Sequence, residues 1–528
     1  MRSTFSGFNT AKSGLFASQR ALDITGHNLA NVNTRGYSRQ RLEQFQSTPL
    51  KLAGGQGMLG TGVDTHSINQ LRNEFLDYKY RDEASSLGYW ETKADGLSYI
   101  ESIMNEPSDT GISKVIDALF ESFQELSKNP DNLTTRSLVR ERASAFASSI
   151  NHMYTQLEKT AVDYNFDVNS MVNTINTYGK QIAALNDQIL RFEVDGSNAN
   201  DLRDQRNVLI DDLSKIVDVE IQEIANPDNP EHKQMVIKIA GKPLVYHKDF
   251  TGLKVTSVQN KFFNDEVGKQ FDFNEIEWMD GTAFNKSNVG GQLEGLLAMR
   301  DGEGDQTKGF PYSEKGIPYY IKELNKFVNV FANEVNNMHL KGYGLDGNTG
   351  RAFFTANGVT GKDATIATDA DGNLLYGTDG KLDSTTNAIF RNMNASNIKI
   401  SIDIEDPNHI AASKEKDLIP KDGSIMLDII ALRHKTSMFK EGKPEDFIKS
   451  LIGTLGVEAE EADRSAINQA VLVDEIENRR MSVSGVFQDE ELANMVKFQH
   501  AYNASARMMT TIDEMLDTLI NKIGIVGR

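Results

Sequence analysis

Hydrophobic residues near the N-terminal end of the chain recur with the spacing of a helix that packs against another helix. Large apolar residues return every seven positions, and smaller residues stand three positions after each of them. The large residues are Phe8, Leu15, Leu22 and Leu29, and the smaller ones are Ala11, Ser18, Thr25 and Val32. An apolar repeat of three and four is typical of a coiled-coil helix. The spacing therefore predicts a long N-terminal helix with one apolar stripe.

The C-terminal end carries a longer stripe of the same kind. Its positions, in steps of three and four, are Met495, Phe498, Tyr502, Ser505, Met509, Ile512, Leu516, Leu519, Ile523 and Val526. The acids Asp489, Glu490 and Glu491 precede it, where negative charge stabilises a helix N-terminus. We expect a helix of about 35 residues and about 50 Å. Because neither helix can bury its stripe alone, we expect the two to pair; the alternative is that both stripes face one common globular core.

Between the two ends, the apolar pattern switches between helical and strand-like spacing. Residues 61–215 and 290–340 show helical spacing. Residues 218–247 alternate between apolar and polar and turn at Pro and Gly, which predicts strands. The stretch "NIKISIDIED" (397–406) alternates in the same way and predicts one further strand.

These switches divide the chain into segments and predict its fold class. The predicted segments are 1–60 (N-terminal helix and connector), 61–215 (first part of a helical body), 216–289 (β-rich insert), 290–340 (second part of the body), 341–423 (second β-rich insert), 424–485 (third part of the body) and 486–528 (C-terminal helix). We therefore predict an α+β multidomain fold. It would combine a terminal-helix coiled coil, an elongated helical-bundle body and two inserted β-rich domains.

Composition narrows the classes of function. The 528 residues carry a net charge of −19, which argues against nucleic acid and against an anionic membrane as partners. The chain has no cysteine, so disulfides, thiolate metal sites and cysteine catalysis are excluded. There is no apolar run of about 18 residues and no apolar core of a Sec signal peptide near residue 1. These rules alone predict a cytoplasmic protein.

The sequence offers no recognisable catalytic or metal-binding motif. Its nine histidines are scattered without HExxH spacing, and neither GxxxxGK[ST] nor GxSxG occurs. "DADGN" (369–373) faintly resembles a calcium loop but lacks the Gly and the Glu that such a loop needs, so a β-turn is favoured. We therefore expect no catalytic residue, no metal and no cofactor. An enzyme or binding module that uses the β-rich inserts is the alternative.

An Asn-rich break follows the N-terminal stripe, and it carries a family resemblance. "ALDITGHNLANVNTRGYSRQR" (21–41) resembles the signature of flagellar rod, hook and hook-associated proteins, a heptad helix followed by A-N-x-N-T-P-G-Y. The matching residues are Ala30, Asn31, Asn33, Thr34, Gly36 and Tyr37. Arg35 stands where many members have proline, so the resemblance implies a less rigid loop. "GYSRQ" (36–40) is more similar to hook-associated members than to hook or rod proteins.

Other stretches resemble the same family. They are "GTGVDTHSINQLRNEFLDYKYR" (60–81), "GGQLEGLLAMRD" (290–301) and the C-terminal stretch 484–521 with its A-Y, T-x-D-E and L-x-T-L elements. Phe487 departs from the pattern, since members often carry Ser or Asn there. That departure removes the usual N-cap of the C-terminal helix.

The resemblance implies a structural protein of the bacterial flagellum that forms the junction between hook and filament and serves motility. The alternative within the family is another axial component, such as the hook protein or a distal rod protein. The terminal helices would pair as the inner layer of a tubular assembly. The residues implied for this layer are Phe8, Leu15, Leu22 and Leu29 on the N-terminal helix, and Met495, Phe498, Tyr502, Met509, Ile512, Leu516, Leu519 and Ile523 on the C-terminal helix.

The resemblance also implies partners and a location. The chain would bind copies of itself in a ring or helical layer, the hook protein and a second hook–filament junction protein. Before export, a cytosolic chaperone would cover the C-terminal helix. Members leave the cell through the flagellar type III export apparatus without a cleaved signal, which replaces the cytoplasmic expectation by secretion to the extracellular flagellum. Nucleic acid and membrane insertion are not expected.

Overall fold

The computed structural model describes residues 6–51, 57–104, 111–225, 233–263, 270–362, 364–377 and 382–522. The chain forms two compact units. The first holds Met1–Leu87, Thr174–Leu253 and Asn468–Arg528, and the second holds Gly88–Asn173 and Lys254–Ile467. The boundary falls within the long helices α2 (Glu74–Met104), α4 (Leu133–Glu193) and α10 (Pro444–Ser484).

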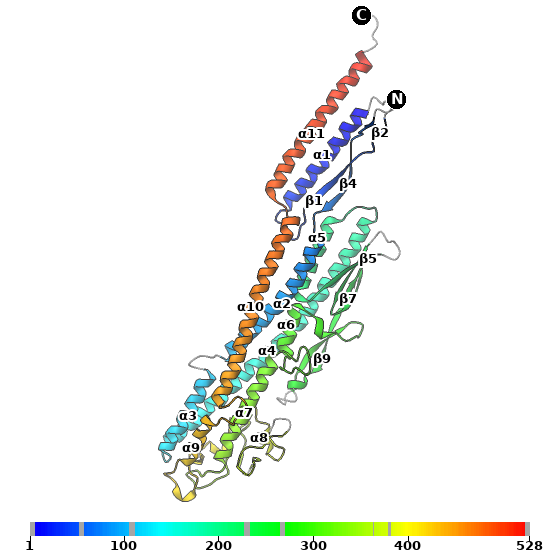
Figure 1. The fold of residues 1–528 in the computed structure, drawn as a ribbon. Coiled ribbons are helices and arrows are strands. Elements are labelled where there is room, and N and C mark those ends of the chain that lie inside the picture. Colours follow the sequence, from blue (N-terminus) through cyan, green and yellow to red (C-terminus); the bar gives the residue numbers. More distant parts are fainter. Residues whose placement is uncertain are drawn as a thin grey trace. The chain divides into compact units, whose positions relative to one another are not determined.

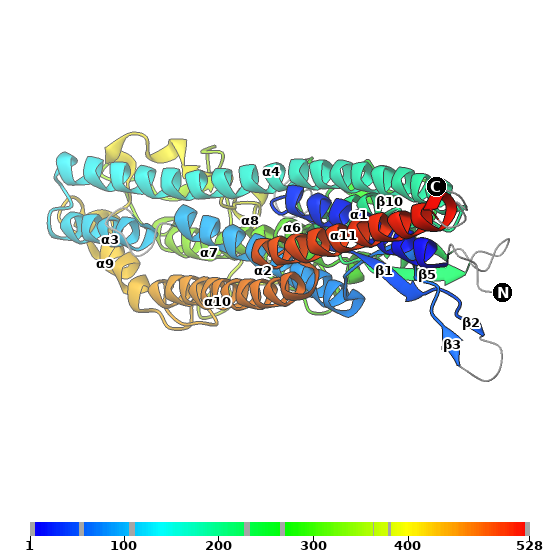
Figure 2. The same ribbon diagram turned by 90° about the horizontal axis from the view of Figure 1, so that it is seen from above.

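The first unit is built around the two terminal helices, α1 (Ser6–Ala30) and α11 (Gln488–Asp517), which lie side by side (Figures 1 and 2). A π-helical turn, η8 (Thr518–Lys522), extends α11. Strand β1 (Gln40–Gln46) pairs antiparallel with β4 (Val63–Gln70), and β2 (Leu50–Lys51) pairs with β3 (Met58–Leu59). The ribbon of β1 and β4 packs against α1.

The rest of the first unit contains α5 (Asn200–Ile216) and a four-stranded antiparallel sheet. The sheet runs in chain order through β5 (Glu220–Ala225), β6 (Lys233–Ile239), β7 (Lys242–Tyr246) and β8 (Asp249–Phe250). Side-chain amides of α4 satisfy the backbone beside it: Asn176 Nδ2 donates to the carbonyl of Leu253 at 2.7 Å. Gly179 allows close packing, because an added Cβ would lie 2.6 Å from the Phe250 ring.

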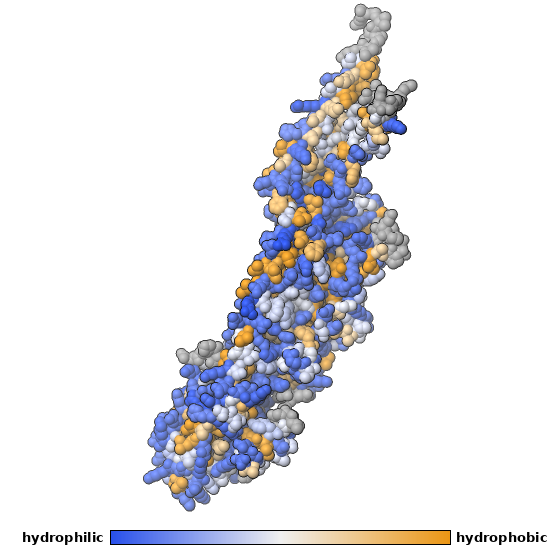
Figure 3. Space-filling model, in the orientation of Figure 1, coloured by the Kyte–Doolittle hydropathy of each residue, from blue (hydrophilic) through white to orange (hydrophobic). Residues whose placement is uncertain are grey.

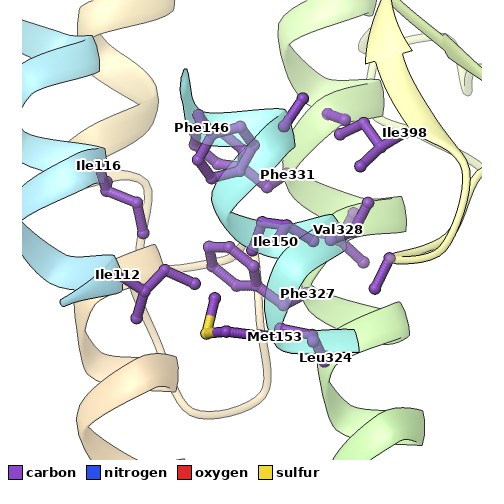
Figure 4. Close-up of a cluster of buried hydrophobic side chains, with 14 of the residues drawn as sticks. Ile112, Ile116, Phe146, Ile150, Met153, Leu324, Phe327, Val328, Phe331 and Ile398 are labelled. Carbon is purple, nitrogen blue, oxygen red and sulfur yellow. The ribbon is translucent and has the colours of Figure 1, made fainter. Parts of the chain in front are cut away.

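The second unit is mainly helical. Its helices are α3 (Ile112–Lys128), α6 (Gly291–Asp301), α7 (Ile317–His339), α8 (Ala388–Arg391) and α9 (Ser424–Ala431), with the adjoining parts of α2, α4 and α10. Strand β9 (Leu253–Gln259) pairs with β10 (Asp272–Trp278), and β11 (Phe354–Ala356) pairs with β12 (Ile398–Ile400). Figure 4 shows its core, where side chains of α3, α4, α7 and β12 interlock; Phe327 stacks on Phe331 with ring centroids 5.6 Å apart.

The predicted strand over 397–406 is wrong beyond residue 400. Strand β12 ends at Ile400, and the 3-10 helix η4 (Ile402–Ile404) follows directly. Ser401 starts this turn, because its hydroxyl accepts a hydrogen bond from the backbone N–H of Asp403 at 3.2 Å. Ser and Asp side chains compete in this way with the strand ladder, although the apolar alternation continues.

The predicted fold class is confirmed: the protein is α+β, with long terminal helices and small antiparallel sheets inserted among body helices. The described part of the chain contains no helix that is both long and apolar enough to cross a lipid bilayer.

Candidate assembly site on the terminal helix pair

Small residues of α1 lie close to α11. A Cβ added to Gly7 would lie 3.4 Å from Cδ1 of Ile512, and one added to Gly14 would lie 3.1 Å from Oγ of Ser505. Asn28 Nδ2 donates to Oε2 of Glu491 at 3.1 Å. The contacting positions recur at multiples of seven residues on both helices and in opposite order, so they define one antiparallel register.

We call the contacts of Gly7, Gly14 and Asn28 with α11 the seam. Residues of the predicted N-terminal stripe stand next to these positions in the sequence. Phe8, Leu15, Leu22 and Leu29 are half-buried, whereas the buried residues of α1 are Ala11, Ala17, Ser18, Ala21, Ile24, Thr25 and Asn28. The buried hydroxyls are satisfied within the helix: Ser18 donates to the carbonyl of Gly14 and Thr25 to that of Ala21, both at 2.8 Å. Small side chains with internally bonded hydroxyls allow the two backbones to approach closely.

The predicted C-terminal stripe lies along one face of α11. Met495, Phe498, Tyr502, Met509, Ile512 and Leu516 are all half-buried. Leu519 is exposed at the far end, and Ile523 lies outside the described residues. Phe498 lines a groove of about 610 Å³ together with Ala21 and Phe45.

Apolar side chains of the terminal helix pair also remain exposed. Leu492, Val496, Met508 and Met515 of α11 are between 43% and 61% exposed. Phe45, Leu50 and Met58 of the adjoining strands are between 56% and 72% exposed. Figure 3 shows hydrophobic residues at the surface of this part of the molecule. Exposed apolar patches of this kind typically mark protein–protein contact sites.

The connector after α1 is a series of turns closed by the signature residues. Tyr37 donates from its hydroxyl to Oδ1 of Asn28 at 2.7 Å. Thr34 Oγ1 donates to Oδ1 of Asn31 at 3.1 Å, and Asn31 Nδ2 donates to the carbonyl of His27 at 3.0 Å. Ala30 and Asn33 are exposed. The Asn residues thus end the helix by bonding to nearby backbone and side-chain groups.

Gly36 and Arg35 fix the connector against α5. The φ angle of Gly36 is 76°, and an added Cβ would lie 2.0 Å from Cγ2 of Val208. Arg35 forms a forked ion pair with Asp212, with NH2–Oδ1 at 2.5 Å and NH1–Oδ2 at 3.3 Å. The hydrogen bond to Asp212 is the main cause that raises the pKa of Arg35. Arg35 therefore ties the connector to α5.

After the connector, the chain is bonded to the buried carboxylate of Asp204. Ser38 donates to Asp204 from its backbone N–H at 2.9 Å and from its hydroxyl at 2.8 Å. Arg72 NH1 lies 3.4 Å from Oδ1 of the same carboxylate. Burial raises the pKa of Asp204 to about 6, although the bonds from Ser38 and the charge of Arg72 oppose the rise.

A second charged cluster joins α2, α5 and the end of α10. Arg480 lies 2.7 Å from Asp211 and 3.0 Å from Asp77, and Arg81 lies 2.7 Å from Asp211. These residues belong to no motif that the sequence reveals. Charged residues on a helix resemble a solvated face, and only the folded chain brings together partners that are far apart in sequence.

The described residues provide no metal centre: no group of three or more His, Asp or Glu side chains among them is arranged to hold an ion. In the "DADGN" stretch, Asp369 Oδ1 accepts hydrogen bonds from the backbone N–H groups of Asp371 and Asn373, both at 2.9 Å. The stretch is therefore a turn closed by its own side chain.

Matches to known protein families first define a class. Residues 8–37 match the family "Flagella basal body rod protein", and residues 478–522 match "Flagellar basal body rod FlgEFG protein C-terminal". Residues 97–354 match "Flagellar hook-associated protein FlgK helical domain". These matches cover parts of both terminal helices and of the body between them. They place the chain among the axial proteins of the bacterial flagellum.

Relatives narrow the class to one family. The chain is 32% identical over 552 aligned positions to flagellar hook-associated protein 1 of Bacillus subtilis (strain 168), covering 100% of both chains. It is 26% identical to flagellar hook-associated protein 1 of Salmonella typhimurium, covering 97% of this chain and 99% of the relative. The chain belongs to the flagellar hook-associated protein 1 family. The assignment from "GYSRQ" is thereby confirmed over the hook and distal rod alternatives.

A solved structure shares the fold. The structure of the flagellar hook junction protein FlgK from Burkholderia pseudomallei matches with a TM-score of 0.57 at 15% identity. The match covers 78% of this chain and 100% of that one.

Proposed function

We propose that the chain is a structural component of the bacterial flagellum that forms the junction between hook and filament, and that it assembles through its paired terminal helices. Membership of the hook-associated protein 1 family supports this proposal. The observation that carries it is the terminal helix pair, which packs closely along small residues and still exposes Leu492, Val496, Met508 and Met515. Neighbouring subunits would cover these exposed apolar side chains in the assembly.

The partners follow from this role. Copies of the chain would contact one another through the terminal helices, with the hook protein on one side and a second junction protein on the other. The chain would reach the extracellular flagellum through the flagellar export apparatus. A cytosolic chaperone would cover α11 until export, because its exposed apolar side chains would otherwise cause premature association.

Complementation tests the structural role. In a strain that lacks the gene for this chain, the unaltered chain is expected to restore swimming and filaments attached to hooks. Leu516→Asp places a charge within the half-buried stripe of α11 and is expected to abolish both. Failure of the unaltered chain would contradict the junction role, and normal swimming with Leu516→Asp would contradict assembly through the paired helices.

Pull-down tests the chaperone separately. The full chain is expected to retain the chaperone of its own flagellar system, whereas a chain that ends at residue 486 is expected to lose it. Retention by the shortened chain would contradict the placement of the chaperone on α11.

A further inference from the structure

The break between α10 and α11 lacks the usual helix cap. Helix α10 ends at Ser484 and α11 begins at Gln488, so residues 485–487 separate two long helices. Phe487 occupies the N-cap position of α11. A phenyl ring has no oxygen to accept the unpaired N–H groups of the first turn, whereas Ser, Asn or Asp would have one. Another group must therefore hold the break.

Arg39 contacts both sides of this break. Its backbone N–H donates to the carbonyl of Ser484, the last residue of α10, at 2.8 Å. Its guanidinium donates from NH1 to Glu490 Oε2 at 2.8 Å, and Nε lies 2.7 Å from Glu491 Oε1. Both acids lie in the first turn of α11. One residue of the N-terminal region thus connects the end of one helix to the start of the next.

The contact with Glu491 is buried and has a second partner. The Glu491 side chain is 2% exposed, and Asn28 Nδ2 donates to its other oxygen at 3.1 Å. Asn28 also bonds both backbone groups of Gln40, donating to its carbonyl at 2.9 Å and accepting from its N–H at 3.0 Å. Because Gln40 follows Arg39 in the chain, the start of α11 is fixed to the end of α1 and to the start of β1 together.

We propose that Arg39 fixes the break between α10 and α11 and so seats the C-terminal helix on α1. Because a guanidinium only donates, Arg39 does not cap the N–H groups of α11. It acts through its backbone bond to the Ser484 carbonyl and through its contacts with the carboxylates of Glu490 and Glu491.

Apolar packing alone discriminates weakly between different registers of α11 along α1. The reason is that Gly7, Gly14 and Ala21 are all small and recur every seven residues. A buried polar contact at one end selects one arrangement. The proposal concerns the free chain and does not depend on flagellar assembly.

Disulfide trapping measures this seating directly. The chain has no cysteine, so the double variant Gly14→Cys with Ser505→Cys can form one intramolecular disulfide only. A Cβ on Gly14 would lie 4.0 Å from the Cβ of Ser505, within the range that disulfides adopt. In the full chain with this pair, Arg39→Met is expected to slow disulfide formation about fivefold, the order of effect of losing one intramolecular hydrogen bond. Arg41→Met is the matched control, since Arg41 lies two residues further on, is exposed, and its loss is expected to leave the rate unchanged.

Restoring a cap separates this role from general stability. Adding Phe487→Ser to Arg39→Met supplies an acceptor oxygen at the N-cap but restores no contact of Arg39, so disulfide formation is expected to stay slow. Phe487 is 47% exposed, so its replacement removes little packing. Equal rates for Arg39→Met and Arg41→Met would overturn the proposal. Full recovery of the rate by Phe487→Ser would also overturn it, since a cap alone would then account for the effect.

A milder variant covers the case in which Arg39→Met does not fold. Arg39→Lys keeps the backbone N–H and the charge, but a single ammonium cannot reproduce a fork between two carboxylates. Arg39→Lys is expected to slow disulfide formation less than Arg39→Met, and adding Phe487→Ser is expected to leave that rate unchanged. A rate for Arg39→Lys equal to that of the chain with Arg39 intact, or full recovery on adding Phe487→Ser, would again overturn the proposal.

Discussion

Gly36 is the connector residue whose identity the backbone itself requires. Its φ of 76° lies in the left-handed region, and an added Cβ would lie 2.0 Å from Val208 Cγ2. Gly36→Ala is therefore expected to lower the free energy of unfolding by about 3 kcal/mol, combining backbone strain with overpacking. Denaturant unfolding of the full chain measures the loss.

Gly196 offers a matched control for the contact with Val208. Its φ is 83°, but among the described residues an added Cβ there would meet open space. Gly196→Ala is expected to cost only the strain of the backbone, about 1 kcal/mol. Equal losses in the two variants would show that Val208 contributes nothing to the requirement for glycine at position 36.

Asp204 gives the unfolding free energy a specific pH dependence. Burial raises its pKa to about 6 from an ordinary value of 3.8, so the folded state binds the proton more tightly than the unfolded state. This contribution to stability is present below the unfolded pKa and is lost as the pH rises through about 6. Relative to Asp204→Asn, the unaltered chain is expected to lose about 1–3 kcal/mol between pH 4 and pH 7. Unfolding curves of both chains across this range measure the difference, and parallel curves would contradict the raised pKa.

The sequence predicts some of these residues and misses others for physical reasons. Gly36 and Tyr37 are recognisable because the connector needs their backbone freedom and hydroxyl locally. Asp204 is not, because its role depends on Ser38 and Arg72, which reach it only in the folded chain. Arg35 departs from the family signature, and its ion pair with Asp212 supplies a tether that the sequence alone does not reveal.

At the scale of the helices, the seam between α1 and α11 depends on small residues. Gly14 faces Ser505 so closely that a Cβ would lie 3.1 Å from its Oγ. Gly14→Leu is therefore expected to push the helices apart and to increase amide hydrogen exchange along α11 by about tenfold or more, as overpacking of a close contact costs about 1–3 kcal/mol.

Gly26 provides the control within the same helix. An added Cβ there meets open space among the described residues, so Gly26→Leu changes helix propensity without entering the seam. Its exchange rates along α11 are expected to equal those of the unaltered chain. Faster exchange in both variants would mean that the seam does not depend on Gly14.

The two terminal helices were predictable because a heptad repeat survives in the sequence whatever the fold around it. The seam was harder to predict, since large apolar residues draw attention to Leu15 and Leu22, whereas Gly7 and Gly14 also lie close to α11. The strand expected over 397–406 ends at Ile400, because apolar alternation does not reveal the local competition from Ser401. Periodicity therefore predicts which elements form better than it predicts how they meet.

At the scale of the whole molecule, α11 carries two kinds of apolar surface, one half-buried and one exposed. The half-buried stripe, which includes Ile512, holds α1, whereas Met508 and Met515 are 53% and 61% exposed. If Met508 and Met515 serve assembly, replacing them by charged residues should block polymer formation and leave the pair of α1 and α11 intact. That separation distinguishes assembly from folding of the subunit.

The double variant Met508→Asp with Met515→Asp tests this separation. When it is combined with Gly14→Cys and Ser505→Cys, the disulfide between the two introduced cysteines is expected to form at the rate seen without the Asp substitutions, because the seam is untouched. In a strain that lacks the gene, the double variant without the cysteines is expected to leave hooks without filaments, since charged residues cannot replace buried apolar ones between subunits. Ile402→Asp is the control, because Ile402 is 59% exposed in the second unit. Normal swimming with the double variant would mean that neighbouring subunits do not cover this face of α11.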